Sequence, residues 1–224
     1  MLDLRNIDCM ELMKQYEDKY FDLAIVDPPY GINIGNQKAS ISPQKGNGNR
    51  RRLEWNSNWD SEIPNEKYFT ELKRVSKNQI IWGGNYFIDY LSNTRCVLIW
   101  DKVQEFSGSD FEMAWTSFDK ASKIFRYARC MMHHYPDGEE KIHPTQKPIK
   151  LYEWILKNYA DWEHLGSTSR YKVLDTHLGS GSSAIASHYF GCQFVGCEID
   201  KEYFEKTMKR IKEKTAQTQI SFNH

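Results

Sequence analysis

The 224-residue chain lacks several features that mark large classes of proteins. It has five cysteines, and none are spaced as Cys-x-x-Cys, so the sequence predicts neither a disulfide framework nor a four-cysteine zinc site. No apolar run approaches the roughly 18 residues that cross a bilayer, and the first residues, MLDLRNIDCM, do not resemble a signal peptide. We therefore expect a soluble cytoplasmic protein with reduced thiols and no membrane partner.

Two further absences narrow the choice of ligands. The 30 Lys and Arg residues balance the 30 Asp and Glu residues, so no overall positive field indicates a nucleic-acid partner, and local charge must decide. The sequence also lacks the phosphate-binding pattern that ends in Gly-Lys-Ser/Thr, and it lacks the third glycine of the dinucleotide fingerprint. Nucleotides rich in phosphate are therefore disfavoured.

Short apolar runs alternate with amphipathic patterns along the chain. This alternation predicts an α/β fold, with a mainly parallel, doubly wound sheet that helices cover on both faces. The length suits a single domain, residues 1–224. The expected strands are residues 21–27, 79–84, 96–101, 111–118, 171–177 and 193–200, and the expected helices are residues 65–77, 147–160, 182–191 and 201–214.

The strands at 96–101 and 111–118 are an exception to the alternation. Only the polar sequence KVQEFSGSD separates them, which is too short for a crossover helix, so we expect an antiparallel hairpin. Two longer segments, 32–60 and 119–142, show no periodicity. The first is rich in Gly, Asn and Ser and predicts a long mobile loop, a kind of segment that is uncommon unless it is functional.

The sequence YKVLDTHLGSGSSAIA predicts a strand, a glycine turn and a helix. The strand ends at Asp175, the turn contains Gly179 and Gly181, and the helix begins at about Ser182. Glycines allow close approach of a ligand, and a helix N-terminus binds polar oxygens. The next strand ends in Glu198, where an acid can accept hydrogen bonds from ribose hydroxyls. These features suit a ligand that contains adenosine, although a plain strand-to-helix turn would explain the glycines alone.

The sequence DPPY follows the strand at 21–27. Pro28 and Pro29 stiffen the backbone and remove two N–H donors, so the carbonyl groups here are rigid acceptors. Asp27 adds a carboxylate and Tyr30 a flat ring, at the carboxyl end of a parallel strand where α/β sheets bind ligands. Together these groups could hold an exocyclic amine on a stacked base. A proline turn that only ends the strand is the alternative.

A third pattern, HPTQKP, spans residues 143–148 and stands directly before a helix. Thr145 is placed to cap that helix, Pro148 suits its first turn, and Lys147 offers a cation to a carboxylate. By itself this pattern predicts no more than a helix start.

Together, and in this order, these motifs resemble those of the amino-methylating DNA methyltransferases. DPPY comes first and the glycine loop, VLDTHLGSGSSA, followed by FVGCEID, comes last, which is the permuted order of the β class of the N4/N6 family. The block NIDCMELMKQYEDKYFDLAIVDPPY is also similar, with Asp8 at the matching acid. The resemblance extends over nearly all of the chain except 32–60 and 119–142. It implies the methyltransferase fold with a reversed hairpin edge, and S-adenosylmethionine as the cofactor.

The resemblance also implies roles for individual residues. Glu198 would hold the ribose of the cofactor and Asp8 its adenine amino group. The loop 175–181 would hold the methionine portion, and Thr145 and Lys147 would close over that end. His177 departs from the usual Asp-Pro-Phe of the family and would pack on the cofactor. The full set of expected cofactor-binding residues is Asp8, Cys9, Asp27, Thr145, Lys147, Pro148, Asp175, His177, Gly179, Ser180, Gly181, Ser182, Glu198 and Ile199.

The expected catalytic residues are Asp27, Pro28, Pro29 and Tyr30. The amine of a flipped-out base would donate to the Asp27 carboxylate and the Pro28 carbonyl while Tyr30 stacks on the base. In the resembled family an Asp at this position favours adenine and a Ser favours cytosine. We therefore expect a site-specific DNA methyltransferase that acts on adenine N6.

Contacts to double-stranded DNA are expected from the segment 32–60. Its basic residues Lys45, Arg50, Arg51 and Arg52 lie near two tryptophans and suit contacts with phosphates. A solvated loop with incidental charge is the alternative. Residues 119–142 would form a short target-recognition segment.

Other functions remain open at this point. Cytosine-N4 methylation uses the same chemistry, and a catalytically inactive DNA-binding subunit would keep the fold. The family also implies a setting in restriction and modification, and its members often dimerise, so a homodimer is a further expectation. Cys130, His133, His134 and His143 have irregular spacing, so we expect a structural or exposed cluster and no metal.

Overall fold

The computed structural model describes residues 1–33, 60–103, 109–128, 142–143, 145–160 and 170–216. Within them, eight strands form one sheet in the order β1-β8-β7-β2-β3-β5-β4-β6. The pairs β1–β8, β8–β7, β7–β2, β2–β3 and β4–β6 are parallel. The strands are β1 (Leu2–Arg5), β2 (Phe21–Val26), β3 (Ser76–Trp82), β4 (Val97–Asp101), β5 (Phe111–Thr116), β6 (Lys123–Arg126), β7 (Lys172–Asp175) and β8 (Gln193–Cys197).

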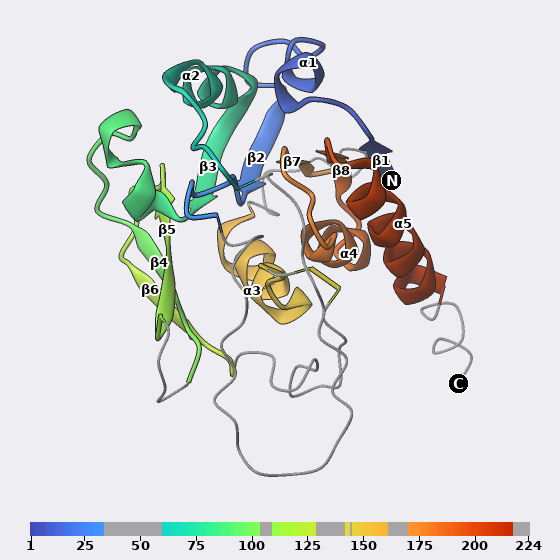
Figure 1. The fold of residues 1–224 in the computed structure, drawn as a ribbon. Helices are drawn as coiled ribbons and strands as arrows, with labels where there is room; N and C mark the ends of the chain where they lie inside the picture. The colour runs from blue at the N-terminus through green and yellow to red at the C-terminus, as the bar shows by residue number, and fades with distance from the viewer. Residues whose placement is uncertain (34–59, 104–108, 129–141, 144, 161–169, 217–224) are drawn as a thin grey trace.

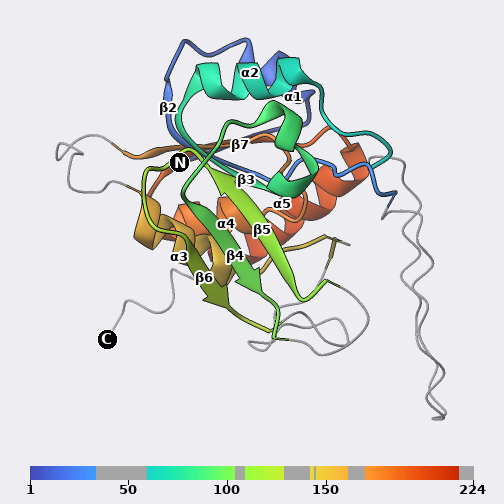
Figure 2. The ribbon, with the colours of Figure 1, turned by 90° about the vertical axis from the view of Figure 1, so that its left-hand side faces the viewer.

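Helices cover both faces of the sheet, as Figure 1 shows and the turned view of Figure 2 confirms. One face carries α1 (Cys9–Met13) and α2 (Glu66–Val75). The other face carries α3 (Ile149–Tyr159), α4 (Ser182–Tyr189) and α5 (Lys201–Ala216). Two short 3-10 turns, η2 (Gly84–Tyr86) and η3 (Ile88–Tyr90), follow β3. The predicted α/β fold is confirmed.

The central strand β2 shows why the sheet needs helices on both sides. Successive side chains of a strand point to opposite faces. Leu23 and Ile25 belong to the core under α3 and α4, whereas Ala24 and Val26 belong to the core under α1 and α2. All four are at most 1% exposed, so an unbroken apolar run, rather than an alternating one, is what both faces require.

The hairpin of β4 and β5 is antiparallel, as expected from the short polar connection between them. The hairpin lies beyond β3 toward one end of the sheet, with one further strand outside it. β5 also pairs antiparallel with β3 and is therefore inserted between β3 and β4. β6 pairs with β4 and forms the outer edge, visible in Figure 2. Within the segment 119–142, which shows no periodicity in the sequence, Lys123–Arg126 form a strand, because they pair with β4 although their side chains are mostly exposed.

The other edge strand, β1, was also not recognised from the sequence. Its four residues are all half-buried, and they pair in parallel with β8, about 190 residues away in the sequence. A strand of this length carries little periodicity of its own. Because β1, β8, β7 and β2 are parallel neighbours, the segments that follow them emerge side by side at one edge of the sheet.

Candidate active site

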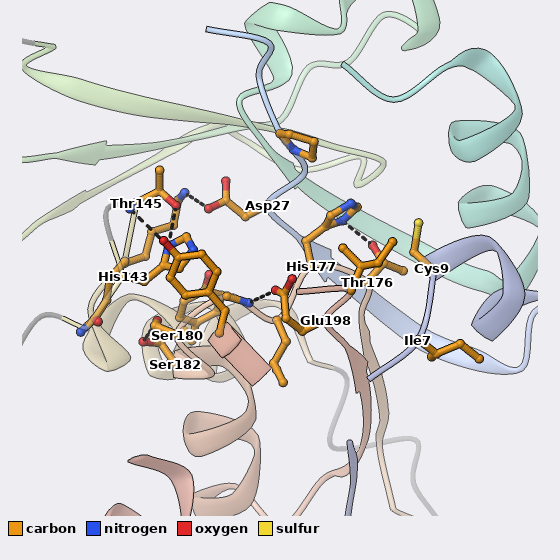
Figure 3. Close-up of a pocket in the computed structure, with 18 of the residues that line it drawn as sticks. Ile7, Cys9, Asp27, His143, Thr145, Thr176, His177, Ser180, Ser182 and Glu198 are labelled. Carbon is orange, nitrogen blue, oxygen red and sulfur yellow. Dashed lines mark hydrogen bonds and ion pairs between the residues drawn. The ribbon is translucent and has the colours of Figure 1, made fainter. Parts of the chain in front are cut away.

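The segments after these four strands bring the predicted motifs together. β1 leads to Asp8, β8 to Glu198, β7 to the glycine loop, and β2 to Asp27. Residues from all four segments line one cavity of about 250 Å³, shown in Figure 3. This is where ligands bind in open parallel sheets.

Most of the predicted cofactor-binding residues line this cavity. They are Asp8, Cys9, Asp27, Thr145, Lys147, His177, Gly179, Ser180, Ser182, Glu198 and Ile199. Pro148, Asp175 and Gly181 are not in the lining, although all three adjoin residues that are. Thr176 and Leu178, inside the expected loop 175–181, also line the cavity, and so does Pro29, which was assigned to catalysis. The lining residues outside these predictions are Ile7, His143, Gln146, Tyr152 and Tyr203.

The glycine loop has a backbone that only glycine adopts easily. Gly179 and Gly181 have φ angles of +49° and +75°. A Cβ on Gly181 would lie 2.7 Å from Cγ2 of Thr207, so the loop also packs too closely on α5 for a side chain. Thr207 donates a hydrogen bond to the Gly179 carbonyl, and Arg210 donates to the Ser180 carbonyl. Helix α5 therefore holds the loop from behind.

Glu198 connects the end of β8 to this loop. Its carboxylate accepts hydrogen bonds from the Gly179 N–H at 3.0 Å, drawn in Figure 3, and from the Asp200 N–H at 3.1 Å. Burial raises the pKa of Glu198, and these two N–H donors oppose the rise. The carboxylate is thus fixed in direction at the cavity wall, with lone pairs left for further donors.

Asp8 has a structural role that the sequence did not reveal. It is the N-cap of α1, and its Oδ1 accepts from the N–H groups of Met10 at 2.8 Å and Glu11 at 3.1 Å. The cap fixes the side chain where it lines the cavity. One side chain can therefore begin the helix and present an acceptor to a ligand.

The buried carboxylate of Asp175, at the end of β7, accepts hydrogen bonds from two residues that follow it in the chain. Ser183 donates to Asp175 Oδ2 at 2.5 Å, and the N–H of His177 donates to Oδ1 at 3.0 Å. Burial raises the pKa of Asp175 to about 7. Asp175 thus supports the loop from below the cavity floor rather than lining it.

His177 presents its ring to the cavity, as Figure 3 shows. Its Nδ1 lies 3.0 Å from Thr176 Oγ1, and its ring meets Tyr68 edge-on at 5.4 Å. Burial lowers the pKa of His177 to about 4, so the imidazole is neutral at pH 7. A neutral ring in this position does not repel a cationic ligand.

The DPPY segment carries the most constrained groups of the site. The Tyr30 hydroxyl donates to Asp27 Oδ1 at 2.5 Å. The backbone N–H groups of Tyr30 and Gly31 donate to Asp60 Oδ1 at 2.6 and 3.0 Å. Asp60 is 2% exposed and comes from a distant part of the chain, so it anchors the turn beyond the two prolines. Sequence reasoning missed this anchor because nothing in the local pattern links the two segments.

The ring of Tyr30 packs against a tyrosine and against the glycine that follows β3. It stacks on Tyr86 with centroids 4.8 Å apart and planes 11° from parallel. A Cβ on Gly83 would come within 2.1 Å of its Cε1, so only glycine leaves room for the ring. One face of the Tyr30 ring is therefore covered by Tyr86.

Lys147 is paired with two carboxylates of the protein. Its Nζ lies 2.5 Å from Asp27 Oδ2 and 3.0 Å from Glu112 Oε2, and its side chain is 1% exposed. Lys102 Nζ lies 3.0 Å from the other oxygen of Glu112. The cation that HPTQKP offers to a carboxylate is thus paired with Asp27, and its expected place over the methionine end of a cofactor stays a prediction.

The four charged groups influence one another strongly. Burial raises the pKa of Asp27, and the Lys147 ammonium opposes this. Burial also acts against the charge of Lys147, but Asp27 and Glu112 outweigh it and the pKa of Lys147 is raised. Glu112 lies between two ammonium groups, which overcome its burial and lower its pKa to about 2.

The HPTQKP segment begins α3 in a way that differs from the prediction. Pro148 is the N-cap, and Thr145 does not cap the helix. Thr145 Oγ1 instead lies 3.1 Å from His143 Nδ1, and the His143 ring meets Tyr203 edge-on at 4.6 Å. Thr145 lines the cavity, and no side chain caps α3.

Several predictions fall outside the described residues. These are Lys45, Arg50, Arg51 and Arg52 in the basic segment, most of 119–142, and Cys130, His133 and His134. Among the described residues, no group of three or more His, Cys, Asp or Glu side chains is arranged to hold a metal ion. No described helix is long and apolar enough to cross a membrane.

Comparisons with known proteins agree with the geometry. The family described as DNA methylase matches residues 101–209. A type II methyltransferase of Haemophilus influenzae, M.HinfI, is 25% identical over 92% of this chain and 67% of its own length. M2.LlaDCHI of Lactococcus lactis subsp. cremoris, also a type II methyltransferase, is 22% identical over 93% of this chain and 88% of its own length.

Solved structures show the same fold. The M1.HpyAVI–SAM complex has a TM-score of 0.54 and 21% identity, covering 94% of this chain and 100% of that one. The PvuII DNA methyltransferase, whose title calls it cytosine-N4-specific, has a TM-score of 0.58 and 12% identity, covering 96% of this chain and 92% of that one. At such identities the likeness concerns the fold alone.

Proposed function

We propose that the chain is a DNA methyltransferase of the N4/N6 family, which its similarity to that family supports, and that it transfers the methyl group of S-adenosylmethionine to the N6 amine of adenine in double-stranded DNA. The observation that carries the proposal is one cavity whose lining includes Asp8, Glu198, the glycine loop and Asp27. The fixed carboxylate of Glu198 suits ribose hydroxyls, and Asp8 suits an amino group. Ile7 and Ile199 supply apolar walls for a base.

The glycine loop and His177, which also line the cavity, suit the methionine end of S-adenosylmethionine. The loop at Gly179 and Ser180 offers backbone groups at the start of α4, and the neutral His177 tolerates a nearby sulfonium. When bound, S-adenosylmethionine supplies an activated methyl group on sulfur. The relative M1.HpyAVI was solved with SAM, which supports the same choice here.

Asp27 is the residue that we assign to the target amine. An exocyclic amine is a poor nucleophile because its lone pair is delocalised into the ring. A carboxylate that accepts one of its hydrogens, with the Pro28 carbonyl accepting the other, favours a pyramidal nitrogen with an available lone pair. Tyr30 and Lys147 already hold the two oxygens of Asp27 in place, so the acceptor is oriented before the substrate arrives.

The base must leave the duplex to reach this position, since its amine is inaccessible within the stack. We assign the Tyr30 ring to stacking on the flipped base, and the basic residues Lys45 and Arg50 to Arg52 to contacts with phosphates. Residues 119–142 remain our proposal for target recognition. The relatives named as type II methyltransferases favour a modification enzyme of restriction and modification.

Cytosine-N4 methylation is the second candidate, because it uses the same chemistry and a methyltransferase titled cytosine-N4-specific shares this fold. Asp27 before Pro-Pro-Tyr favours adenine. Incubating the purified protein with unmethylated DNA and labelled cofactor, followed by hydrolysis to nucleosides and mass spectrometry, separates the two. N6-methyldeoxyadenosine is the expected product. N4-methyldeoxycytidine would replace our assignment of the base, and absence of both, with cofactor bound in calorimetry, would favour an inactive DNA-binding subunit.

A further inference from the structure

Four charged side chains form a row that leads to the proposed catalytic carboxylate. Lys102 follows β4, Glu112 belongs to β5, Lys147 precedes α3, and Asp27 follows β2. The three N···O distances along the row are 3.0, 3.0 and 2.5 Å. Because β5 runs antiparallel to β3, its first residues reach the edge of the sheet where the parallel strands end. The inserted strand β5 therefore places the carboxylate of Glu112 beside Lys147.

A second carboxylate partner fixes the position of the Lys147 ammonium. A lysine ammonium is a point charge on a flexible stem, and one carboxylate fixes it less well than two on different sides. Glu112 provides the second, and the rings of Trp82 and Tyr30 lie 5.4 and 5.9 Å from the ammonium. The 1% exposure of Lys147 leaves little water to replace either carboxylate.

The same arrangement limits how far Lys147 neutralises Asp27. An ammonium shared between two carboxylates neutralises each of them less than an ammonium bound to one. Asp27 consequently keeps more of its strength as a hydrogen-bond acceptor for an amine. The like charge of Glu112 raises the pKa of Asp27, whereas Lys147 lowers it.

We propose that Glu112 is a positioning residue for methyl transfer: it is the second carboxylate bound to the Lys147 ammonium, so that the carboxylate of Asp27 stays both oriented and a strong acceptor. Glu112 does not line the cavity and acts on the substrate only through Lys147 and Asp27. The inference rests on the proposed function. It adds a residue that none of the recognised motifs contains.

The test is the variant Glu112→Gln, which keeps the shape of the side chain and removes its charge. We expect kcat to fall about 10- to 100-fold, as for loss of a hydrogen bond between charged groups, with KM for S-adenosylmethionine within about twofold of the original. Asp110→Asn is the matched control, since it removes an exposed acid that precedes the same strand. Its kinetics should be those of the original chain.

The pH profile separates positioning from a general effect on the fold. The charged and titratable groups around Asp27 are Lys147 and Tyr152 from the α3 segment, Glu112 from β5, Lys102 from β4, Tyr30 from its own segment and Asp175 from β7. Glu112→Gln should move the acidic limb of kcat/KM to lower pH, because a like charge beside Asp27 is removed. Lys147→Met should move that limb to higher pH.

If Glu112→Gln does not fold, Lys102→Gln tests the same inference, because it removes the other ammonium that pairs with Glu112. Without Lys102, Glu112 attracts Lys147 more strongly, so the acidic limb should move to higher pH. Absence of methyl transfer by the original chain would overturn the proposed function. With the original chain active, an unmoved acidic limb, or a kcat within twofold in Glu112→Gln, would overturn this inference alone.

Discussion

The ring of Tyr30 lies flat against the ring of Tyr86, 4.8 Å away and 11° from parallel. Tyr86 is 42% exposed, and its neighbour Gly83 approaches Tyr30 closely enough to exclude a side chain. If Tyr30 stacks on the target base, as proposed, Tyr86 covers a face that the base could use. The base then has to displace Tyr86 or stack elsewhere.

Tyr86→Ala should therefore lower KM for DNA by about two- to tenfold, the range that corresponds to the roughly 0.5–1.5 kcal/mol of an aromatic pair. Steady-state kinetics with duplex DNA measures this. Ile88→Ala, at an exposed apolar position in the following turn, is the matched control and should change KM little. A rise in KM for Tyr86→Ala would mean that Tyr86 itself binds the DNA.

Asp27→Asn should reduce kcat by at least about 100-fold while cofactor binding remains, since the amide accepts a hydrogen bond less strongly than the carboxylate. Methyl transfer and calorimetry with S-adenosylmethionine measure the two properties separately. Asp119→Asn removes an 84% exposed acid and serves as the control. Near-normal turnover of Asp27→Asn would contradict the role given to Asp27.

Comparing Gly181→Ala with Gly191→Ala separates the cost of backbone strain from the cost of a steric clash, because the two glycines have nearly the same φ angle. Both glycines have positive φ, +75° and +71°, but a Cβ would meet Thr207 and Ile211 at Gly181 and nothing within 4 Å at Gly191. Gly191→Ala should lose about 1 kcal/mol of unfolding free energy through backbone strain. Gly181→Ala should lose more and should also weaken cofactor binding. Urea denaturation and calorimetry measure both, and equal losses would contradict the close packing of α5.

His177 predicts a dependence of stability on pH. Its pKa is about 4 in the folded chain and about 6.5 in an unfolded one, so protonation favours unfolding. The stability from this group is complete above pH 6.5 and is lost as the pH falls toward 4. Between pH 7.5 and 5, the original chain should lose of the order of 1 kcal/mol more than His177→Asn in urea denaturation. His188→Asn, at an exposed position of α4, is the control for histidine replacement. Parallel curves for the original chain and His177→Asn would contradict the burial of this imidazole.

The basic residues of the segment 32–60 predict how DNA affinity depends on salt concentration. Replacing Arg50, Arg51 and Arg52 with Ala should reduce the slope of log affinity against log salt by about 0.9 for each phosphate that is no longer neutralised. Fluorescence anisotropy with labelled duplex DNA at several salt concentrations gives the slope. An unchanged slope would remove these residues from the DNA interface.

The sequence predicted the parts of the site that depend on local patterns. The strand before DPPY and the glycine turn before α4 are recognisable because apolar runs and glycines appear within a few residues of one another. The strands end at Val26, Asp175 and Cys197, so Asp27 and Glu198 directly follow their strands.

Interactions between distant segments were not predictable in this way. Asp60 anchors the turn at Tyr30, Arg210 holds the carbonyl of Ser180, and Glu112 reaches Lys147 only because β5 is inserted into the sheet. The pairing of Lys147 with Asp27 was not recognised because the two residues are 120 positions apart in the sequence. Two edge strands, β1 and β6, were missed because each is four residues long and acquires its conformation by pairing.

The pairing of β1 with β8 and the support of the glycine loop by α5 have a consequence for synthesis of the chain. β1 can pair only after β8 has been synthesised, and the carbonyl of Ser180 can accept its hydrogen bond from Arg210 only after α5 has been synthesised. Pairings so far apart in sequence form slowly and cannot form on a partial chain. A nascent polypeptide that still lacks α5 would therefore hold DPPY in its strand but no complete cofactor cavity, so translation itself delays the onset of activity until α5 has been synthesised.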